Sequence, residues 1–422
     1  MKKCISVLLL LTLILSLFAA CKASDQPQED IIINPEPQKV DDKEPDASFR
    51  DSYKNLALQL FQNAAKDSQG ENLLLSPLSV QLALAMTANG ADGQTRQEME
   101  NLLGQGIPLE DLNLYLHTYV QSLPAEEKAK LSLANSIWMR DQKDRLTVEE
   151  SFLQTNADYY GAELFSRPFD STTAKEINNW VDQKTEGMIP EIVKKIPDES
   201  VMYLINAMAF DAEWAQPYEE YAIRDDGTFT ALSGQQQTVS MMHGSEDTYL
   251  DDGRATGFVK MYSGEQYGFA VLLPNEGEDL YEYIGSLTAD GITKTLRDAE
   301  YCQVITQLPK FSYDYELMMN DMLKEMGMPT VFDAGKADLS RLGQSAEGNL
   351  YVSQVLHKTF IQVDGMGTRA GAVTVVEITP ESAMGSEPEH KEVIVDRPFV
   401  YMILDMENNL PLFIGCVTEI TE

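Results

Sequence analysis

The spacing of the apolar residues changes near residue 200, and this change limits the folds open to the chain more than any other feature. Before it, apolar residues recur at helical spacing, as in residues 49–64 and 173–186. After it, apolar and β-branched residues form short runs that are typical of strands: 201–210, 268–273, 302–308, 359–363, 399–404 and 412–417. Helices weighted to the first half and strands to the second predict a single α+β domain.

A helix that follows Ser76 is predicted to be central to this fold. Ser76 is a good N-cap residue, and Pro77 suits the first turn of a helix. The sequence that comes next, VQLALAMTANG, is apolar on nearly every face of a helix. We therefore expect this helix to be buried on all sides.

Composition narrows the class of protein and of partner. The chain has 422 residues, of which 43% are hydrophobic and 23% charged, as expected for a mostly globular protein. Its formal net charge is −35. Because phosphate binding needs a basic surface, this charge argues against nucleic acid as a partner.

The first 48 residues have the features of an export signal and a tether. Residues 1–20 combine a basic start with one apolar run, which predicts a signal peptide rather than a membrane span. The sequence LFAAC, which ends at Cys21, resembles the bacterial lipobox, in which the cysteine is lipidated; an ordinary secretory signal cut nearby is the alternative. Residues 21–48 then form an acidic, proline-rich tether, and residues 49–422 form the folded domain. We expect a bacterial lipoprotein, extracellular or at the cell surface, whose only membrane contact is its lipid anchor.

Cys302 and Cys416 are the two cysteines outside the predicted signal and lipidation site. Two cysteines cannot form the disulfide framework on which small secreted domains depend, so packing must stabilise this chain. The sequence leaves open whether the two pair, although both lie in apolar or β-rich runs where a buried thiol is common.

The usual local signatures of catalysis and metal binding are absent. The four histidines, His117, His243, His357 and His390, are far apart, and no zinc motif, P-loop or GxSxG elbow occurs. We therefore expect no metal, no cofactor and no catalytic residue, although groups that meet only in space need no local motif.

Residues 365–370, GMGTRA, match the spacing of the dinucleotide fingerprint GxGxxA and follow a predicted strand. A dinucleotide site needs a helix directly after the fingerprint. Residues 371–376 are instead small or β-branched, and Pro380 follows soon after, so a helix is not expected there. The fingerprint therefore does not predict a cofactor site.

The same segment has the alternation of a strand with one insertable face. Positions 368, 370, 372, 374, 376 and 378 hold small and then apolar residues, and in an extended chain they lie on one side. The segment leads into TPESAMGSEPEHK, which is typical of an exposed, protease-accessible loop. An edge strand followed by a surface turn is the plainer interpretation of this pattern.

Several separated blocks resemble the serpin family, in the family's order and over residues 49–422. They are NLLLSPLSVQLALAMTANGADGQTRQEM (72–99), LANSIWM (133–139), YYGAEL (159–164), INNWVDQKTEGMI (177–189), LINAMAFDAEW (204–214), VLHKTFIQVDGMGTRAGA (355–372), and RPFVYMI with LFIGCV (397–417). The resemblance implies helices packed around a large central mixed β-sheet, smaller sheets, and an exposed reactive-centre loop at about residues 365–391.

The resemblance also implies a function. A serpin is not an enzyme but a serine protease inhibitor that acts as a suicide substrate: its loop is cleaved, the protease is trapped as an acyl-enzyme, and the loop inserts into the central sheet. Cysteine proteases are a further target class, since they also form acyl intermediates. We expect a monomer. The alternative is a non-inhibitory carrier or chaperone of the same fold.

The resemblance assigns roles within the loop. The hinge corresponds to Gly367, Thr368, Arg369, Ala370, Gly371 and Ala372. The chain departs from the family at Gly365 and Arg369, where glutamate is common, and at Val373, where a small residue is usual. Counting from Thr368 as the fourteenth residue before the cut gives Glu381–Ser382 as the reactive bond, with Ala383–Met384 as the alternative because the loop is long.

Five further residues match a part of the family that controls opening of the sheet. Ser76, Ser79, Asn206 and His357 correspond to a polar cluster beneath the sheet, and Trp214 to a tryptophan near the point where the loop enters. Taken alone, His357 would be read as a core histidine with satisfied hydrogen bonds.

Overall fold

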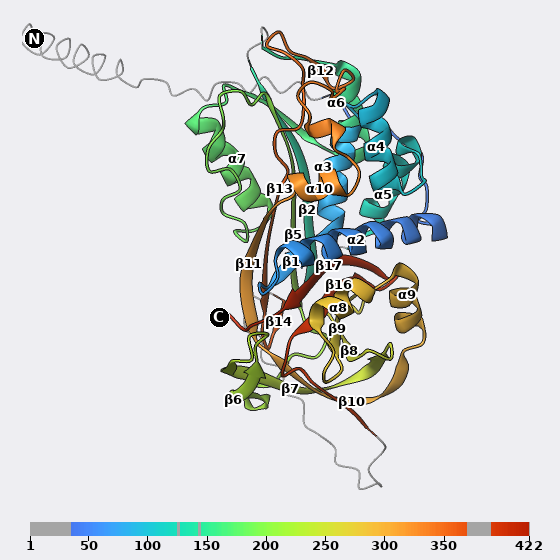
Figure 1. Ribbon diagram of the computed structural model, residues 1–422, viewed down its shortest axis with the longest axis vertical. Helices are drawn as coiled ribbons and strands as arrows, with labels where there is room; N and C mark the ends of the chain where they lie inside the picture. The colour runs from blue at the N-terminus through green and yellow to red at the C-terminus, as the bar shows by residue number, and fades with distance from the viewer. Residues whose placement is uncertain (1–34, 125–126, 142–144, 369–389, 422) are drawn as a thin grey trace, which may run out of the picture. The chain divides into compact units, whose positions relative to one another are not determined.

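The order of elements shows the predicted change from helices to strands, with exceptions in both halves (Figure 1). The computed structural model describes residues 35–124, 127–141, 145–368 and 390–421. Five of the six runs predicted as strands after residue 200 lie wholly in strands, and the sixth, 201–210, does so except for its first residue. The exceptions are strands before residue 200, which include Ala129–Arg140, and helices after it, which include Ala289–Arg297.

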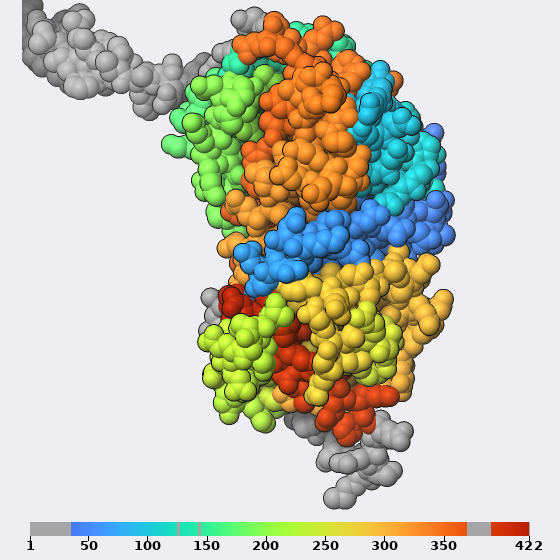
Figure 2. Space-filling model, viewed as in Figure 1, coloured from blue at the N-terminus to red at the C-terminus, as the bar shows by residue number. Residues whose placement is uncertain are grey.

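The described helices lie mostly in the first half of the chain. Their bounds are α2 Ala47–Asp67, α3 Pro77–Ala88, α4 Gly93–Gly104, α5 Leu109–Ser122, α6 Glu150–Tyr160, α7 Ser171–Lys184, α8 Leu280–Ser286, α9 Ala289–Arg297 and α10 Asn320–Glu325, with short 3₁₀ helices η1 Glu220–Ala222 and η2 Thr330–Phe332. In Figure 2, α2, in blue, crosses the visible face of the molecule.

Helix α3 is buried along its length, as its sequence predicts. Ser76 is its N-cap and accepts a hydrogen bond from the Ser79 amide at 3.3 Å, and Pro77 occupies the first turn. All of its residues except Ala83 are buried, because the sheet strand Met202–Glu213 and four neighbouring helices, α2, α4, α5 and α6, pack around it. This helix therefore forms the support beneath the sheet.

A six-stranded mixed sheet contains the segment that the sequence singled out. Its order is β11 Phe311–Met318, β13 Leu356–Val363, β14 Gly367–Thr368, β5 Met202–Glu213, β2 Ala129–Arg140 and β4 Glu163–Arg167. Strands β2 and β4 are parallel and the other neighbours are antiparallel. Because β14 has only two residues, it separates β13 from β5 at one end only.

A nine-stranded sheet and a two-stranded sheet complete the described strands. The large sheet runs β1 Leu73–Leu75, β17 Leu410–Val417, β16 Phe399–Asp405, β9 Tyr267–Pro274, β8 Ala255–Met261, β7 Gln236–Asp251, β10 Glu300–Pro309 and β15 Lys391–Ile394, with β6 Ile223–Thr230 paired to β7. The small one pairs β3 Thr147–Val148 with β12 Gly343–Gln344. The predicted α+β fold with a large mixed sheet and smaller sheets is confirmed.

The described part of the predicted tether lies against α5 and α6. The Gln38 amide donates to the Asp158 carboxylate at 2.6 Å, and the Lys43 amide to Thr118 Oγ1 at 2.8 Å. Lys43 Nζ also lies 2.8 Å from an oxygen of Asp111. The predicted signal peptide and Cys21 lie outside the described residues. Within the described part of the chain, no helix has both the length and the apolar character needed to cross a bilayer.

Candidate functional site: the hinge and the gap in the six-stranded sheet

Two hinge residues already form a strand at one end of the six-stranded sheet. Thr368 of β14 pairs with Ala212 of β5 on one side and with Val363 of β13 on the other. Its side chain is buried, and its hydroxyl lies 2.5 Å from the hydroxyl of Tyr262. The fingerprint residues Gly367 and Thr368 thus lie in a strand, where a dinucleotide site would need the start of a helix.

Gly367 is required by the close approach of its neighbour. A Cβ atom at this position would lie 2.0 Å from the main-chain oxygen of Ala212, far inside van der Waals contact. Only glycine therefore allows β14 to pair with β5 at this point.

Trp214 lies beside the hinge, immediately after β5. Its indole nitrogen donates to the carbonyl of Asp364 at 2.9 Å, and its amide to the carbonyl of Met366 at 2.8 Å. Its ring stacks on Tyr262 with a centroid separation of 4.5 Å. Tyr262, which sequence reasoning did not identify, thus connects Trp214 to Thr368; no local pattern around it signals this role.

Beneath the sheet, Ser76, Ser79 and His357 are joined by hydrogen bonds. The Ser76 amide donates to His357 Nε2 at 3.1 Å, and the Ser76 hydroxyl oxygen caps the Ser79 amide. The same hydroxyl lies 3.1 Å from the sulfur of Met208. Because Nε2 is the acceptor, the proton of the neutral ring lies on Nδ1. Burial lowers the pKa of His357 to about 4, so the ring is neutral at pH 7.

Asn206 faces this cluster from the opposite strand but is bonded elsewhere. Its Nδ2 donates to Asn135 Oδ1 at 2.8 Å, and Asn135 in turn donates to the carbonyl of Tyr160. Among the described residues, no group donates to the buried Asn206 Oδ1. Asn135 was not identified from the sequence, although it lies in the LANSIWM block.

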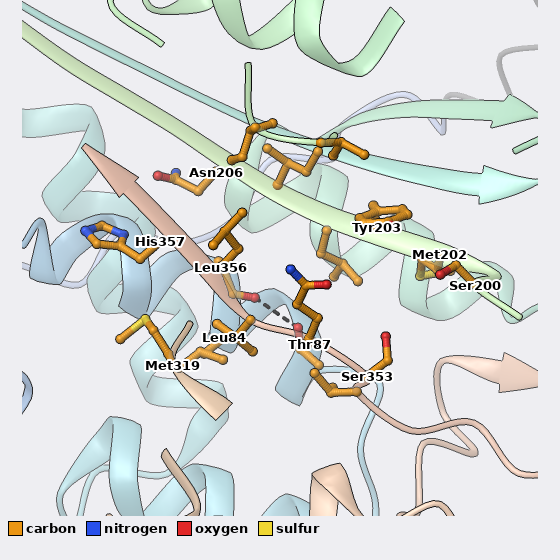
Figure 3. Close-up of a pocket in the computed structure, with 18 of the residues that line it drawn as sticks. Leu84, Thr87, Ser200, Met202, Tyr203, Asn206, Met319, Ser353, Leu356 and His357 are labelled. Atoms are coloured by element: carbon orange, nitrogen blue, oxygen red, sulfur yellow. Dashed lines mark hydrogen bonds between the residues drawn. The ribbon is translucent and has the colours of Figure 1, made fainter. Parts of the chain in front are cut away.

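A cavity of about 540 Å³ separates β5 from β13 beyond β14 (Figure 3). Its lining includes Met202, Leu204 and Asn206 of β5 and Leu356 and His357 of β13. Side chains of α3, among them Leu84 and Thr87, also contribute. In the described part of the sheet β5 and β13 pair with β14 but not with each other. The cavity thus continues the line of β14.

The remaining predicted loop residues lie outside the described residues. These are Arg369, Ala370, Gly371 and Ala372 of the hinge and Glu381, Ser382, Ala383 and Met384 around the two alternative reactive bonds. Their assignments stay predictions.

The cysteines and the possible metal-ligand residues of the described chain form no reactive site. Cys302 is half-buried, Cys416 is buried, and both are free thiols. Burial raises the pKa of the Cys416 thiol to about 12, so the thiol is not reactive at neutral pH. No group of three histidine, cysteine or acidic residues in the described ranges is placed to hold a metal ion.

Comparison with known proteins identifies the family to which the chain belongs. The family model described as Serpin (serine protease inhibitor) matches residues 51–420. The chain belongs to the serpin family. A crystal structure of the thermophilic serpin tengpin in its native state matches this serpin with a TM-score of 0.86 and 46% identity, covering 93% of this chain and 99% of tengpin.

Curated serpins from animals match over almost their whole length. Human serpin B9 is 31% identical to this serpin, over 85% of this chain and 96% of its own. The mouse protein named leukocyte elastase inhibitor A is 30% identical, over 86% of this chain and 96% of its own. The match thus covers 96% of the length of each of these two relatives.

Proposed function

We propose that this serpin inhibits serine proteases as a suicide substrate whose cleaved loop inserts between β5 and β13. The observation that carries the proposal is the position of β14: Thr368 already pairs with both strands and Gly367 with β5, and the cavity continues along the same line. The family and the relative named as an elastase inhibitor support a protease target.

The register of β14 predicts where each inserted residue would lie. Each later loop residue would pair with an earlier residue on both neighbouring strands, since both are antiparallel to β14. Ala370 would then lie between Phe210 and Ile361, and Ala372 between Met208 and Thr359. All four of these flanking positions are buried, which suits the small side chains of the insertable face.

Thr374 would lie between Asn206 and His357 in the same register. Its hydroxyl both donates and accepts, and Asn206 Oδ1 is a buried acceptor that the described groups leave without a donor. Insertion would therefore satisfy a polar group that the uninserted sheet leaves unpaired, in addition to completing the backbone ladder.

The chemistry required of the protease is its ordinary first half-reaction. Its serine oxygen forms an ester with the carbonyl carbon of the cleaved residue, the peptide C–N bond breaks, and the released amine takes a proton. The residue is Glu381, with Ala383 as the alternative. Insertion of the loop carries the ester-linked protease away before water hydrolyses it.

We further propose that the chain is exported and anchored through lipid on Cys21, as a monomer. The basic start, the apolar run and the LFAAC sequence support this proposal.

The experiment uses the chain from residue 22 onward with elastase, chymotrypsin and a glutamate-specific endopeptidase. We expect a covalent complex on denaturing gels with at least one protease, and a released peptide that begins at Ser382 or Met384. Protease whose active serine is already blocked should give neither product. Cleavage by every protease with no trapped complex would contradict inhibition and favour the carrier or chaperone.

A further inference from the structure

Three consecutive carbonyls of the hinge turn accept hydrogen bonds from one short segment. Asp364 accepts from the indole of Trp214 at 2.9 Å, Gly365 from the amide of Tyr218 at 2.8 Å, and Met366 from the amide of Trp214 at 2.8 Å. Residues 214–218 therefore hold the turn from which β14 starts in one position and orientation.

Lys260 of β8 lies directly against this segment. Its ammonium donates to the carbonyl of Gln216 at 3.0 Å, in the middle of the segment. The same ammonium lies 4.3 Å from the ring centroid of Tyr218 and 5.5 Å from that of Trp214. The ammonium thus contacts three residues of the segment: it makes a charge-assisted hydrogen bond to Gln216 and cation–π contacts with Trp214 and Tyr218.

Glu246 of β7 completes the environment of the cation. Its carboxylate accepts from Lys260 Nζ at 2.8 Å, and the side chains of Lys260 and Glu246 are only 4% and 11% exposed. A buried ammonium needs such a partner, because an unpaired charge in this environment is strongly unfavourable. The ion pair therefore holds the ammonium in one place.

The side chain of Lys260 is not needed to form the strands that carry the pair. The backbone of Lys260 pairs with Phe269 of β9, and that of Glu246 pairs with Val304 of β10. The direct ladder between β7 and β8 extends only from Asp251–Thr256 to Tyr249–Phe258. The ion pair bridges the two strands beyond the end of that ladder, where residues 214–218 pack.

We propose that Lys260 is a positioning residue for the hinge: by holding residues 214–218, its ammonium keeps the turn at 364–366 in the position from which the loop inserts. The inference rests on the proposed function for its consequence, which is efficient trapping. Its structural part, the restraint on the hinge, is measurable without any protease.

The test compares Lys260→Met with Lys260→Arg and with Lys54→Met as a matched control. Lys54 in α2 is another buried lysine, and its partners Thr293 and Asp51 lie on other elements or its own helix, away from the hinge. Hydrogen exchange is followed by mass spectrometry on a peptide covering residues 361–368, at a pH where all variants are folded by circular dichroism.

We expect Lys260→Met to exchange at least ten-fold faster in residues 361–368, because loss of the cation loosens residues 214–218, whose N–H groups hold the carbonyls of the turn. Lys260→Arg should restore part of the protection, and Lys54→Met should exchange as the wild type does. With a protease that the wild type traps, Lys260→Met should also be cleaved several times more often per trapped complex.

Unchanged exchange at residues 361–368 in folded Lys260→Met would overturn the proposal. If Lys260→Met does not fold, Glu246→Gln decides, since it keeps the shape but weakens the hold on the ammonium: faster hinge exchange supports the proposal, and unchanged exchange overturns it. If the wild type traps no protease, the proposed function fails, while the exchange comparison still decides the role of Lys260 at the hinge.

Discussion

Protonation of His357 should weaken the native sheet as the pH falls. The imidazole is buried, and its Nε2 accepts from the Ser76 amide at 3.1 Å. A proton on Nε2 would place two donors opposite each other and a charge in the core. Burial accordingly lowers the pKa of His357 from 6.5 to about 4.

The sign and size of the effect follow from this shift. The unfolded chain takes up a proton near pH 6.5 that the native protein does not take up until about pH 4. The contribution of neutral His357 to the free energy of unfolding is therefore fully present above pH 6.5 and is lost as the pH falls toward 4. The loss from this one residue is about 2 kcal/mol at pH 5 and approaches about 3 kcal/mol below pH 4.

The measurement is urea unfolding at pH 7.5 and pH 5.0 for the wild type and for His357→Asn. Asparagine can still accept from the Ser76 amide but does not titrate, so every other group cancels in the comparison. We expect the wild type to lose about 2 kcal/mol more than the variant between the two pH values. Equal losses, or a His357 NMR titration midpoint near 6.5, would refute the reasoning; with four histidines in the chain, the signal can be assigned.

Three substitutions near the hinge give further predictions. Thr368→Arg should turn trapping into plain cleavage on gels, because a charge at this buried position costs on the order of several kcal/mol, whereas Thr368→Ser should still trap. Gly367→Val should abolish trapping and speed exchange in residues 361–368, since its Cβ meets the Ala212 oxygen; Gly285→Ala, which has open space, is the control. Tyr262→Phe should lower the free energy of urea unfolding by about 1 kcal/mol, because the Thr368 hydroxyl loses a buried partner, and an unchanged value would contradict that contact.

The buried face of the hinge illustrates what could be predicted from local sequence. The even positions from Thr368 onward are small and then apolar, and this alternation predicts a strand with one buried face; Thr368 indeed lies buried in a strand. The same local reasoning placed Ser76 as an N-cap and the helix after it at the centre of the fold. It did not show Ala129–Arg140 as a strand.

The candidate site depends on contacts that no local pattern contains. Ser76 and His357 are 281 residues apart in sequence, and only the resemblance to a family suggested that they meet. Neither Tyr262 nor Lys260 has a neighbourhood that distinguishes it from other β-strand residues. Their roles arise because residues 214–218, β7 and β8 converge on the hinge.

The sequence by itself determined the class of the fold, the central position of α3 and the alternation of the hinge segment, because spacing and side-chain size act over a few neighbouring residues. Only the tertiary structure decided that β14 seats two residues between β5 and β13, that a cavity continues its line, and that a buried ion pair supports the turn before it. These features depend on strand register and on the distance between strands. Both are set by packing between segments far apart in the chain, which local periodicity does not record.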